Sequence, residues 1–205
     1  TVADVVDLLT RIQSVALFAQ QGFGADADRS NIFETAYQVA TIKRVYRLQP
    51  VARAGSPNIG AGAASIAAGL PAPVADPDKI VLLAFTSGTT GEPKGVMHSD
   101  NTLLANARAM AADWRHHEEI VLLSMSPLTH AIGTIAMAQA LVSGFELVLN
   151  DVPMGKTTLD WVQKTGATYI MGVPTHAIDV LAETKRRGYD RLGKVSVFYM
   201  GGAAI

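Results

Sequence analysis

The sequence predicts an α/β fold in which mostly parallel sheets are flanked by helices. Short apolar runs, rich in Val, Ile, Leu, Phe and Tyr, alternate with longer amphipathic runs, which is the pattern of strands connected by helices. The short runs are apolar on both faces, as strands are when helices cover both sides of a parallel sheet. With 205 residues, 49% of them hydrophobic and 17% charged, the chain can bury a core of this kind.

Each expected element follows from its own run of residues. Two of the amphipathic runs have clear ends, because Asp100 stands at an N-cap position and Gly188 at the position that follows a helix C-terminus. A stretch rich in proline and glycine, 49–78, interrupts the alternation and predicts a long connection. In chain order, strands are expected at 14–19, 44–48, 80–86, 120–125, 146–149, 167–171 and 194–200, and helices at 2–11, 31–42, 101–114, 132–142, 157–165 and 175–187.

Four loops that follow predicted strands are made mainly of small and polar residues. They are 86–91, 126–133, 172–176 and 201–203. In open α/β sheets, ligands bind outside the carboxyl ends of the strands, so we expect these loops to line one rim. A polar segment at 115–119 separates a helix from the next strand and predicts two α/β sublobes, 1–115 and 116–205, within one domain.

Composition excludes several kinds of partner and site. The formal net charge of −1 provides no positive field to recruit nucleic acid or anionic lipid, so anion binding has to be local. The chain has no cysteine, which excludes disulfides, thiolate metal sites and a cysteine nucleophile and fits a cytoplasmic location. Its most apolar segment, 131–142, is too short to cross a bilayer. His116 and His117 lie in a polar boundary, where we expect solvated side chains rather than a zinc site, and we expect no metal ligand in the chain.

The loop after the run 80–86 has the composition of a phosphate-binding loop. The segment Ser87–Gly95, SGTTGEPKG, contains three glycines that let backbone N–H groups approach a ligand closely. Lys94 adds a positive charge and the hydroxyl groups add donors, so we expect a nucleotide triphosphate. The loop is not a Walker loop, because Lys94 follows Pro93 instead of glycine and leads into a short extended segment instead of a helix. A loop between two extended segments can close over phosphates.

Four segments of the chain resemble motifs of the adenylate-forming enzymes, a superfamily that includes acyl-CoA synthetases, the adenylation domains of peptide synthetases, and luciferases. FTSGTTGEPKGV, Phe85–Val96, resembles its phosphate-binding signature without interruption. SPLTHAIG, Ser126–Gly133, resembles a second motif, in which the residue at the position of His130 lies beside the acyl substrate and the nucleotide. MGGAAI, at the end of the chain, resembles the start of a segment that wraps adenine and the acyl group, and GVPTHAIDVL resembles a helix entry that lines the acyl pocket.

The resemblance implies a two-step reaction that uses ATP, Mg²⁺ and coenzyme A. A carboxylate oxygen attacks the α-phosphorus of ATP and releases pyrophosphate, and the thiol of coenzyme A then displaces AMP from the acyl-adenylate. The resemblance assigns catalytic roles to Lys94 and His130. The residues that it assigns to ATP binding are Thr86, Ser87, Gly88, Thr89, Thr90, Gly91, Lys94, Gly95, Gly201, Gly202 and Ala203.

The later motifs of the superfamily are not found before Ile205. These motifs supply the ligands of Mg²⁺ and of the ribose and a catalytic lysine in a C-terminal domain. We therefore expect the chain to be part of the N-terminal domain of a longer synthetase, and to be inactive alone. In that domain, 1–115 would end in the phosphate loop 86–95 and its following helix, and 116–205 would line the acyl and adenine site.

Two alternatives to an acyl-CoA synthetase stay open. An amino-acid adenylation domain of a peptide synthetase would need an Asp near the pocket mouth to hold the substrate ammonium group. The segment 131–144 contains no Asp or Glu, which favours an uncharged acyl tail, such as that of an aromatic, alicyclic or medium aliphatic acid. The second alternative is a non-catalytic nucleotide-binding fragment.

Overall fold

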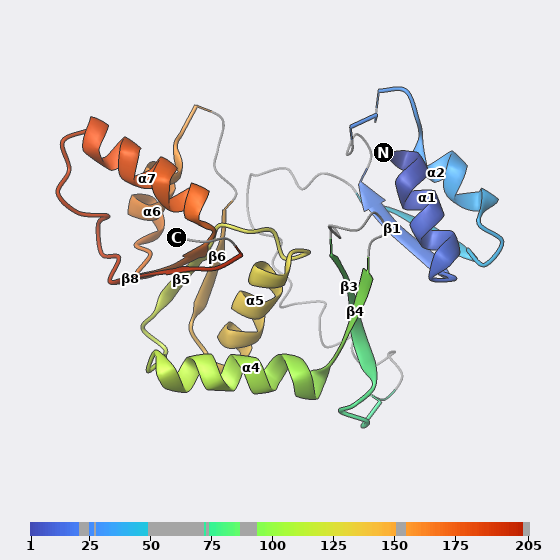
Figure 1. The fold of residues 1–205 in the computed structure, drawn as a ribbon, viewed down its shortest axis with the longest axis horizontal. Coiled ribbons are helices and arrows are strands. Elements are labelled where there is room, and N and C mark those ends of the chain that lie inside the picture. The colour runs from blue at the N-terminus through green and yellow to red at the C-terminus, as the bar shows by residue number, and fades with distance from the viewer. Residues whose placement is uncertain are drawn as a thin grey trace, which may run out of the picture. The chain divides into compact units, whose positions relative to one another are not determined.

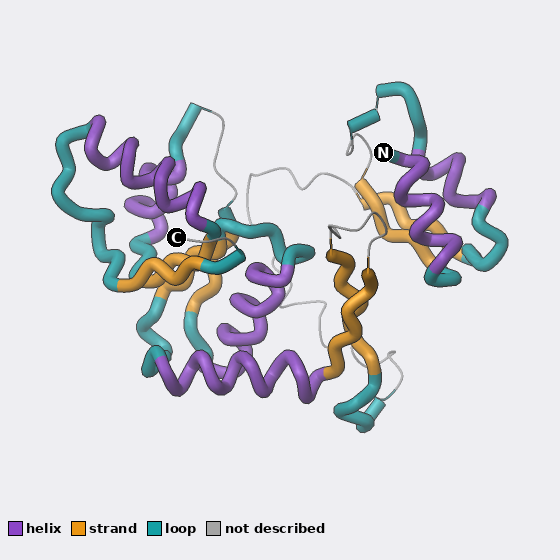
Figure 2. Tube along the Cα trace, viewed as in Figure 1, coloured by secondary structure: helices purple, strands orange, loops and turns teal. Residues whose placement is uncertain are grey.

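The structure of the protein is a computed structural model that describes residues 1–20, 25–26, 28–48, 72, 74–86, 94–150 and 155–202. Its contacts divide the chain into two compact units, Thr1–Ala72 and Pro73–Ile205, which we call unit 1 and unit 2. The two sublobes expected on either side of residue 115 stay a prediction. Figures 1 and 2 show the elements of each unit.

The described part of unit 1 contains two parallel strands packed against short helices. Thr1 begins the first helix with a capping box, in which its side chain accepts from the N–H of Asp4 and the Asp4 carboxylate bonds back. The core of the unit is formed by Leu9, Leu17, Ala36 and Val39. The elements are α1 (Val2–Arg11), β1 (Ala16–Gln20), α2 (Ile32–Thr35), a 3₁₀ turn η1 (Ala36–Gln38) and β2 (Arg44–Leu48).

The single helix expected at 31–42 is wrong, since α2 and η1 together end at Gln38. Val39 leaves the helical conformation with φ −79° and ψ 110°, and its side chain is buried in the core of unit 1. The hydroxyl of Thr41 then donates to the carbonyl oxygen of Ser14 at 2.7 Å, which ties the segment to the chain just before β1. Tertiary contacts therefore override the helical pattern here.

Unit 2 contains a four-stranded parallel sheet with the strand order β6-β5-β7-β8, which confirms the predicted α/β fold. Neighbouring residues of β5 point to opposite faces. Leu122 packs with residues of α4 and α5, and Leu123 packs with residues of α6 and α7. The elements are α4 (Asp100–Asp113), β5 (Val121–Ser124), α5 (Ala131–Ser143), β6 (Glu146–Leu149), α6 (Thr158–Thr165), β7 (Tyr169–Gly172), α7 (Pro174–Arg186) and β8 (Val197–Met200).

Unit 2 also contains an antiparallel hairpin, formed by β3 (Ile80–Thr86) and β4 (Lys94–Ser99). Its hydrogen bonds join it to no strand of the four-stranded sheet within the described residues. The segment 80–86 is therefore not a strand of the four-stranded sheet, and the expectation that the loop 86–91 lines the same rim as the other three loops stays a prediction. Ser99 ends the hairpin and caps α4, so the chain passes directly from the hairpin into a helix that packs against α5.

His116 lies at the buried side of the turn between α4 and β5, whereas its neighbour His117 is exposed. Neither ring nitrogen of His116 has a hydrogen-bond partner among the described residues, and the ring packs edge-on against Phe145 and Tyr169. Burial, with a smaller effect of the charge of His117, lowers the pKa of His116 below its usual 6.5. The folded chain therefore resists protonation at this position.

We expect the free energy of unfolding to decrease as the pH falls below about 6.5, because the unfolded chain then takes up a proton that folded His116 refuses. Replacing His116 by Phe should reduce this loss. The measurement is urea denaturation at about pH 7.5 and about pH 5.5. The exposed neighbour supplies the matched control, since the charge of His117 has the smaller effect on the pKa of His116 and His117→Phe should change the difference between the two pH values much less. An equal effect of both substitutions would contradict the assignment to His116.

Candidate functional site

Three of the four predicted loops meet at the carboxyl edge of the four-stranded sheet. The N–H of Gly201, after β8, donates to the carbonyl oxygen of Gly172, the last residue of β7, at 3.2 Å. A Cβ atom on Gly172 would lie 3.2 Å from the Cβ of Met125, which follows β5. Gly202 lies beside Val173, with φ +88°. Parallel pairing thus brings together segments separated by up to 77 residues, from Met125 to Gly202.

The loop between β5 and α5 presents His130 to solvent as the N-cap of α5. The Nδ1 atom of His130 accepts a hydrogen bond from the N–H of Ile132 at 3.3 Å. An accepting Nδ1 carries no proton, so a neutral ring holds its proton on Nε2 and can donate it to a ligand. The backbone N–H of His130 donates to the carbonyl oxygen of Pro127, which closes the loop into a turn.

Gly133, in the first turn of α5, packs directly against the backbone of this loop. A Cβ atom at Gly133 would lie 2.1 Å from the carbonyl oxygen of Pro127 and 3.0 Å from the Cα of Leu128. Both contacts are to backbone, so neither can be relieved by a side-chain rotation. Although Gly133 lies in the SPLTHAIG segment, the sequence alone gave no reason to assign it a role, because this contact depends on how the loop folds back.

The hairpin end brings together the two ends of the predicted phosphate loop. Thr86 pairs with Lys94 in the β3–β4 ladder, and Phe85 pairs with Gly95. Lys94 is exposed, so its charge is available to an anion. A Cβ at Gly95 would lie 3.0 Å from the side chain of Leu83 and 3.3 Å from the ring of Phe85, so the glycine leaves room for these two side chains. Ser87, Gly88, Thr89, Thr90, Gly91 and Ala203 lie outside the described residues, and their roles stay predictions.

A pocket of about 320 Å³ opens beside the carboxyl edge, between α6 and α7. His176 is one of its lining residues, and its Nδ1 accepts from the N–H of Val173 at 3.3 Å. That bond satisfies a free N–H at the start of α7, so the structure shows a capping role for His176. The pocket is lined by Met125, Asn150, Thr157, Thr158, Leu159, His176, Asp179, Val180 and Glu183.

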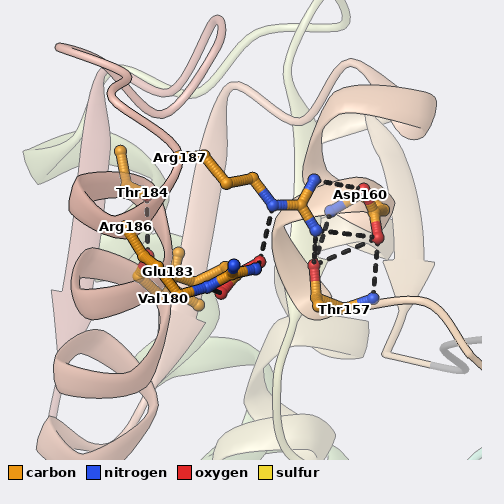
Figure 3. Close-up of polar contacts among 7 residues, drawn as sticks. All are labelled: Thr157, Asp160, Val180, Glu183, Thr184, Arg186 and Arg187. Atoms are coloured by element: carbon orange, nitrogen blue, oxygen red, sulfur yellow. Dashed lines mark hydrogen bonds and ion pairs between the residues drawn. The ribbon is translucent and has the colours of Figure 1, made fainter.

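Arg187 joins the two helices that form this pocket (Figure 3). Its guanidinium group contacts the Asp160 carboxylate of α6 at 2.7 Å and also pairs with Glu183 of α7. Thr157 caps α6 through a Thr-x-x-Asp capping box with Asp160 and accepts from Arg187 at 3.1 Å. Glu183 and Arg187 stand four residues apart, the spacing at which opposite charges on a helix lie side by side. The Thr-x-x-Asp spacing of the capping box is visible in the sequence. Nothing in the sequence, however, links Arg187 to Asp160, which lies 27 positions away.

Hydrogen bonds in this cluster favour the charged carboxylates. Those from Arg187 hold the pKa of Asp160 well below its usual range, and those from Arg186 and Arg187 lower the pKa of Glu183 to about 2. The stability that these bonds add is therefore present above the unfolded pKa values, near 4, and is lost as the pH falls through the folded values.

We expect Arg187→Met to lower the urea midpoint near neutral pH, because it leaves two carboxylates facing each other across α6 and α7 without their shared cation. The variant should also lose less stability than the wild type between about pH 5 and about pH 3. Arg186→Met is the matched control, because Arg186 pairs with Glu183 alone among the described residues and its side chain is 69% exposed, against 24% for Arg187. Its effect on the midpoint should be small. Equal midpoints for the two variants would contradict this role of Arg187.

The described residues contain no group of three or more His, Asp or Glu side chains placed to hold a metal ion. Nor does any helix in the described part of the chain have the length and apolar character needed to cross a membrane.

Comparison with solved structures identifies the fold as that of the N-terminal domain of adenylate-forming enzymes. The N-terminal domain of FACL13 from Mycobacterium tuberculosis matches with a TM-score of 0.77 and 18% identity, over 100% of this chain and 49% of that domain structure. ATP-bound MatB from Rhodopseudomonas palustris matches with a TM-score of 0.69 and 25% identity, over 99% of this chain and 38% of that one. A sequence profile described as AMP-binding enzyme matches residues 1–205, and the chain belongs to this family.

Several curated relatives of the chain are acyl-CoA ligases. The long-chain-fatty-acid–CoA ligase of Bacillus subtilis is 35% identical over 138 residues, which are 65% of this chain and 24% of the relative. The mitochondrial medium-chain acyl-CoA ligase ACSF2 of Bos taurus is 34% identical over 114 residues, which are 53% of this chain and 18% of the relative. The matches therefore span less than a quarter of the length of these relatives.

Proposed function

We propose that the complete protein activates a carboxylic acid with ATP and transfers the acyl group to coenzyme A. In the first step a carboxylate oxygen bonds to the α-phosphorus of ATP as the bond to pyrophosphate breaks. In the second step the coenzyme A thiolate bonds to the acyl carbon as AMP leaves. Membership of the AMP-binding enzyme family and the acyl-CoA ligase relatives support this proposal.

The observation that carries the proposal is the pairing of Thr86 with Lys94, which draws the ends of a glycine- and hydroxyl-rich loop together beside an exposed ammonium group. This donor set fits the β- and γ-phosphates of ATP, whose departure as pyrophosphate needs charge stabilisation more than covalent help. His130, with a proton on Nε2, is suited to donate a hydrogen bond to the acyl or phosphate oxygen. Gly201 and Gly202, at the carboxyl edge, fit a planar adenine or acyl group that approaches the backbone closely.

The proposed reaction uses Mg²⁺, and the resemblance to the superfamily implies that its ligands come from motifs that follow the segment MGGAAI. We also propose a cytoplasmic location for the complete protein. Some relatives differ in this respect, because their names place them in mitochondria.

A specific observation keeps an amino acid as the second candidate substrate. Asp179 lines the pocket at the carboxyl edge and could hold an ammonium group. A relative of the chain, the non-canonical non-ribosomal peptide synthetase ascB of Acremonium egyptiacum, is 28% identical over 133 residues. The segment 131–144 still offers no carboxylate, which favours acids without a charged tail.

An ATP–pyrophosphate exchange assay with a panel of carboxylic acids tests the proposal. The complete protein should support exchange with a medium aliphatic, alicyclic or aromatic acid, and more weakly with amino acids. Residues 1–205 alone should give no exchange above background, because the superfamily motifs that would supply the Mg²⁺ and ribose ligands are not found before Ile205. Nucleotide binding by the complete protein without exchange for any acid would favour the non-catalytic alternative, and exchange only with amino acids would favour the peptide-synthetase alternative.

A further inference from the structure

The loop that carries His130 is fixed by hydroxyl groups of buried residues. The hydroxyl of Ser124, at the end of β5, donates to the carbonyl oxygen of Ser126 at 2.8 Å. The hydroxyl of Thr134, in α5, donates to the carbonyl oxygen of Leu128 at 2.8 Å. The same hydroxyl lies 3.2 Å from the carbonyl oxygen of His130. Ser124 is fully buried and Thr134 is 7% exposed, so water cannot readily replace either donor.

Thr134 differs from the other threonines that bond within their helices. The hydroxyl of Thr184, also buried, donates to the carbonyl oxygen of Val180 one turn earlier, within α7 (Figure 3). The bond from Thr134 to Leu128 instead leaves the helix and reaches the loop, two residues before His130. It therefore couples the position of the loop to the rigid helix rather than repeating a bond that the helix already makes.

His130 depends on this coupling because its ring has only one hydrogen bond of its own among the described residues, the acceptor bond at Nδ1. That bond requires the backbone of His130 to sit one residue before α5 in an extended conformation, with φ −92° and ψ 148°. A shift of the Leu128 carbonyl would change the direction in which Nε2 presents its proton.

We propose that Thr134 is the positioning residue for His130, and that its hydroxyl fixes both the tautomer and the direction of the imidazole. The expected effect of Thr134 on catalysis rests on the proposed function, whereas its expected effect on the imidazole ring of His130 does not. Thr134 touches no substrate in this role and acts through the Leu128 carbonyl and the His130 backbone.

The first test reads the ring directly in residues 1–205. In the wild type, the ¹⁵N chemical shifts should show an unprotonated Nδ1 at His130 and a protonated Nε2. In Thr134→Val, which removes the hydroxyl but keeps the shape, both shifts should move toward the average of a free imidazole. His176 is an internal control, because its Nδ1 makes a bond of the same length to Val173. Unchanged His130 shifts in Thr134→Val would overturn the proposal.

Two further variants keep the test decisive if Thr134→Val does not fold. Thr134→Ser and Thr134→Ala both lose the methyl group and differ only in the hydroxyl. The serine variant should retain the wild-type shifts of His130 and the alanine variant should lose them. Identical shifts in the two variants would overturn the proposal.

The second test measures pyrophosphate exchange by the complete protein. Thr134→Val should lower kcat about tenfold with little change in the KM for ATP, and Thr134→Ser should restore kcat to within about threefold of the wild type. Thr184→Val is the matched control and should leave kcat unchanged. If His130→Ala does not slow exchange, the proposed role of His130 fails, and the ring shifts still decide whether Thr134 positions it. An equal loss in Thr134→Val and Thr184→Val would overturn the positioning role.

Discussion

Lys94→Ala in the complete protein should slow acyl-adenylate formation about 100-fold and leave thioester formation from preformed acyl-adenylate nearly unchanged. Lys94 is the first residue of β4, exposed and opposite Thr86, where its charge can stabilise the departing pyrophosphate. Pyrophosphate takes part only in the first half-reaction, so only that step should lose this stabilisation. The measurement is single-turnover kinetics of the two half-reactions with the acid that the exchange panel identifies.

The hairpin supplies a matched control for the charge. Lys79 directly precedes β3, at the end of the ladder far from the Thr86–Lys94 pair, and is also exposed. Lys79→Ala removes the same group from the same hairpin and should leave both half-reactions unchanged. Equal losses in both half-reactions of Lys94→Ala would contradict a role on the pyrophosphate side.

Gly133→Ala should destabilise the protein by about 3 kcal/mol, although helix propensity alone predicts a gain of about 1 kcal/mol from Gly to Ala. The added Cβ would meet the carbonyl oxygen of Pro127 at 2.1 Å, and relieving this clash requires the loop or the first turn of α5 to move. Because His130 lies on that loop, exchange activity should fall as well. Urea denaturation measures the stability, and the exchange assay measures the activity.

Gly144, at the C-terminal end of the same helix, provides the control. Its φ is +71° and a Cβ there would have no neighbour within 4 Å, so Gly144→Ala introduces backbone strain without a clash. It should cost about 1 kcal/mol and leave exchange activity unchanged. A Gly133→Ala variant as stable as the wild type would show that the loop moves freely and would contradict the packing described for α5.

The strands and most helices could be predicted from the sequence because burial imposes local periodicity. The runs at 80–86 and 146–149 have the predicted bounds, and Asn31 correctly marks a helix start. The helix expected to continue to residue 42 failed at Val39, where a buried position in the core of unit 1 outweighed the local pattern. Local pattern also did not reveal that 94–99 pairs with 80–86, since pairing depends on contacts between segments.

For the candidate site, the residue types and short spacings are enough to predict the chemistry: a glycine- and hydroxyl-rich loop with Lys94, a histidine before an apolar helix, and glycines after the last strand. These are properties of residue types and short spacings, and they suffice to predict the class of ligand and the family. Only the tertiary structure decided that Thr86 and Lys94 face each other, that Gly133 has no room for a methyl group, and that Thr134 holds the loop of His130. The physical reason is that a clash or a hydrogen bond between distant segments depends on tenths of an ångström in their packing, which residue types alone do not specify.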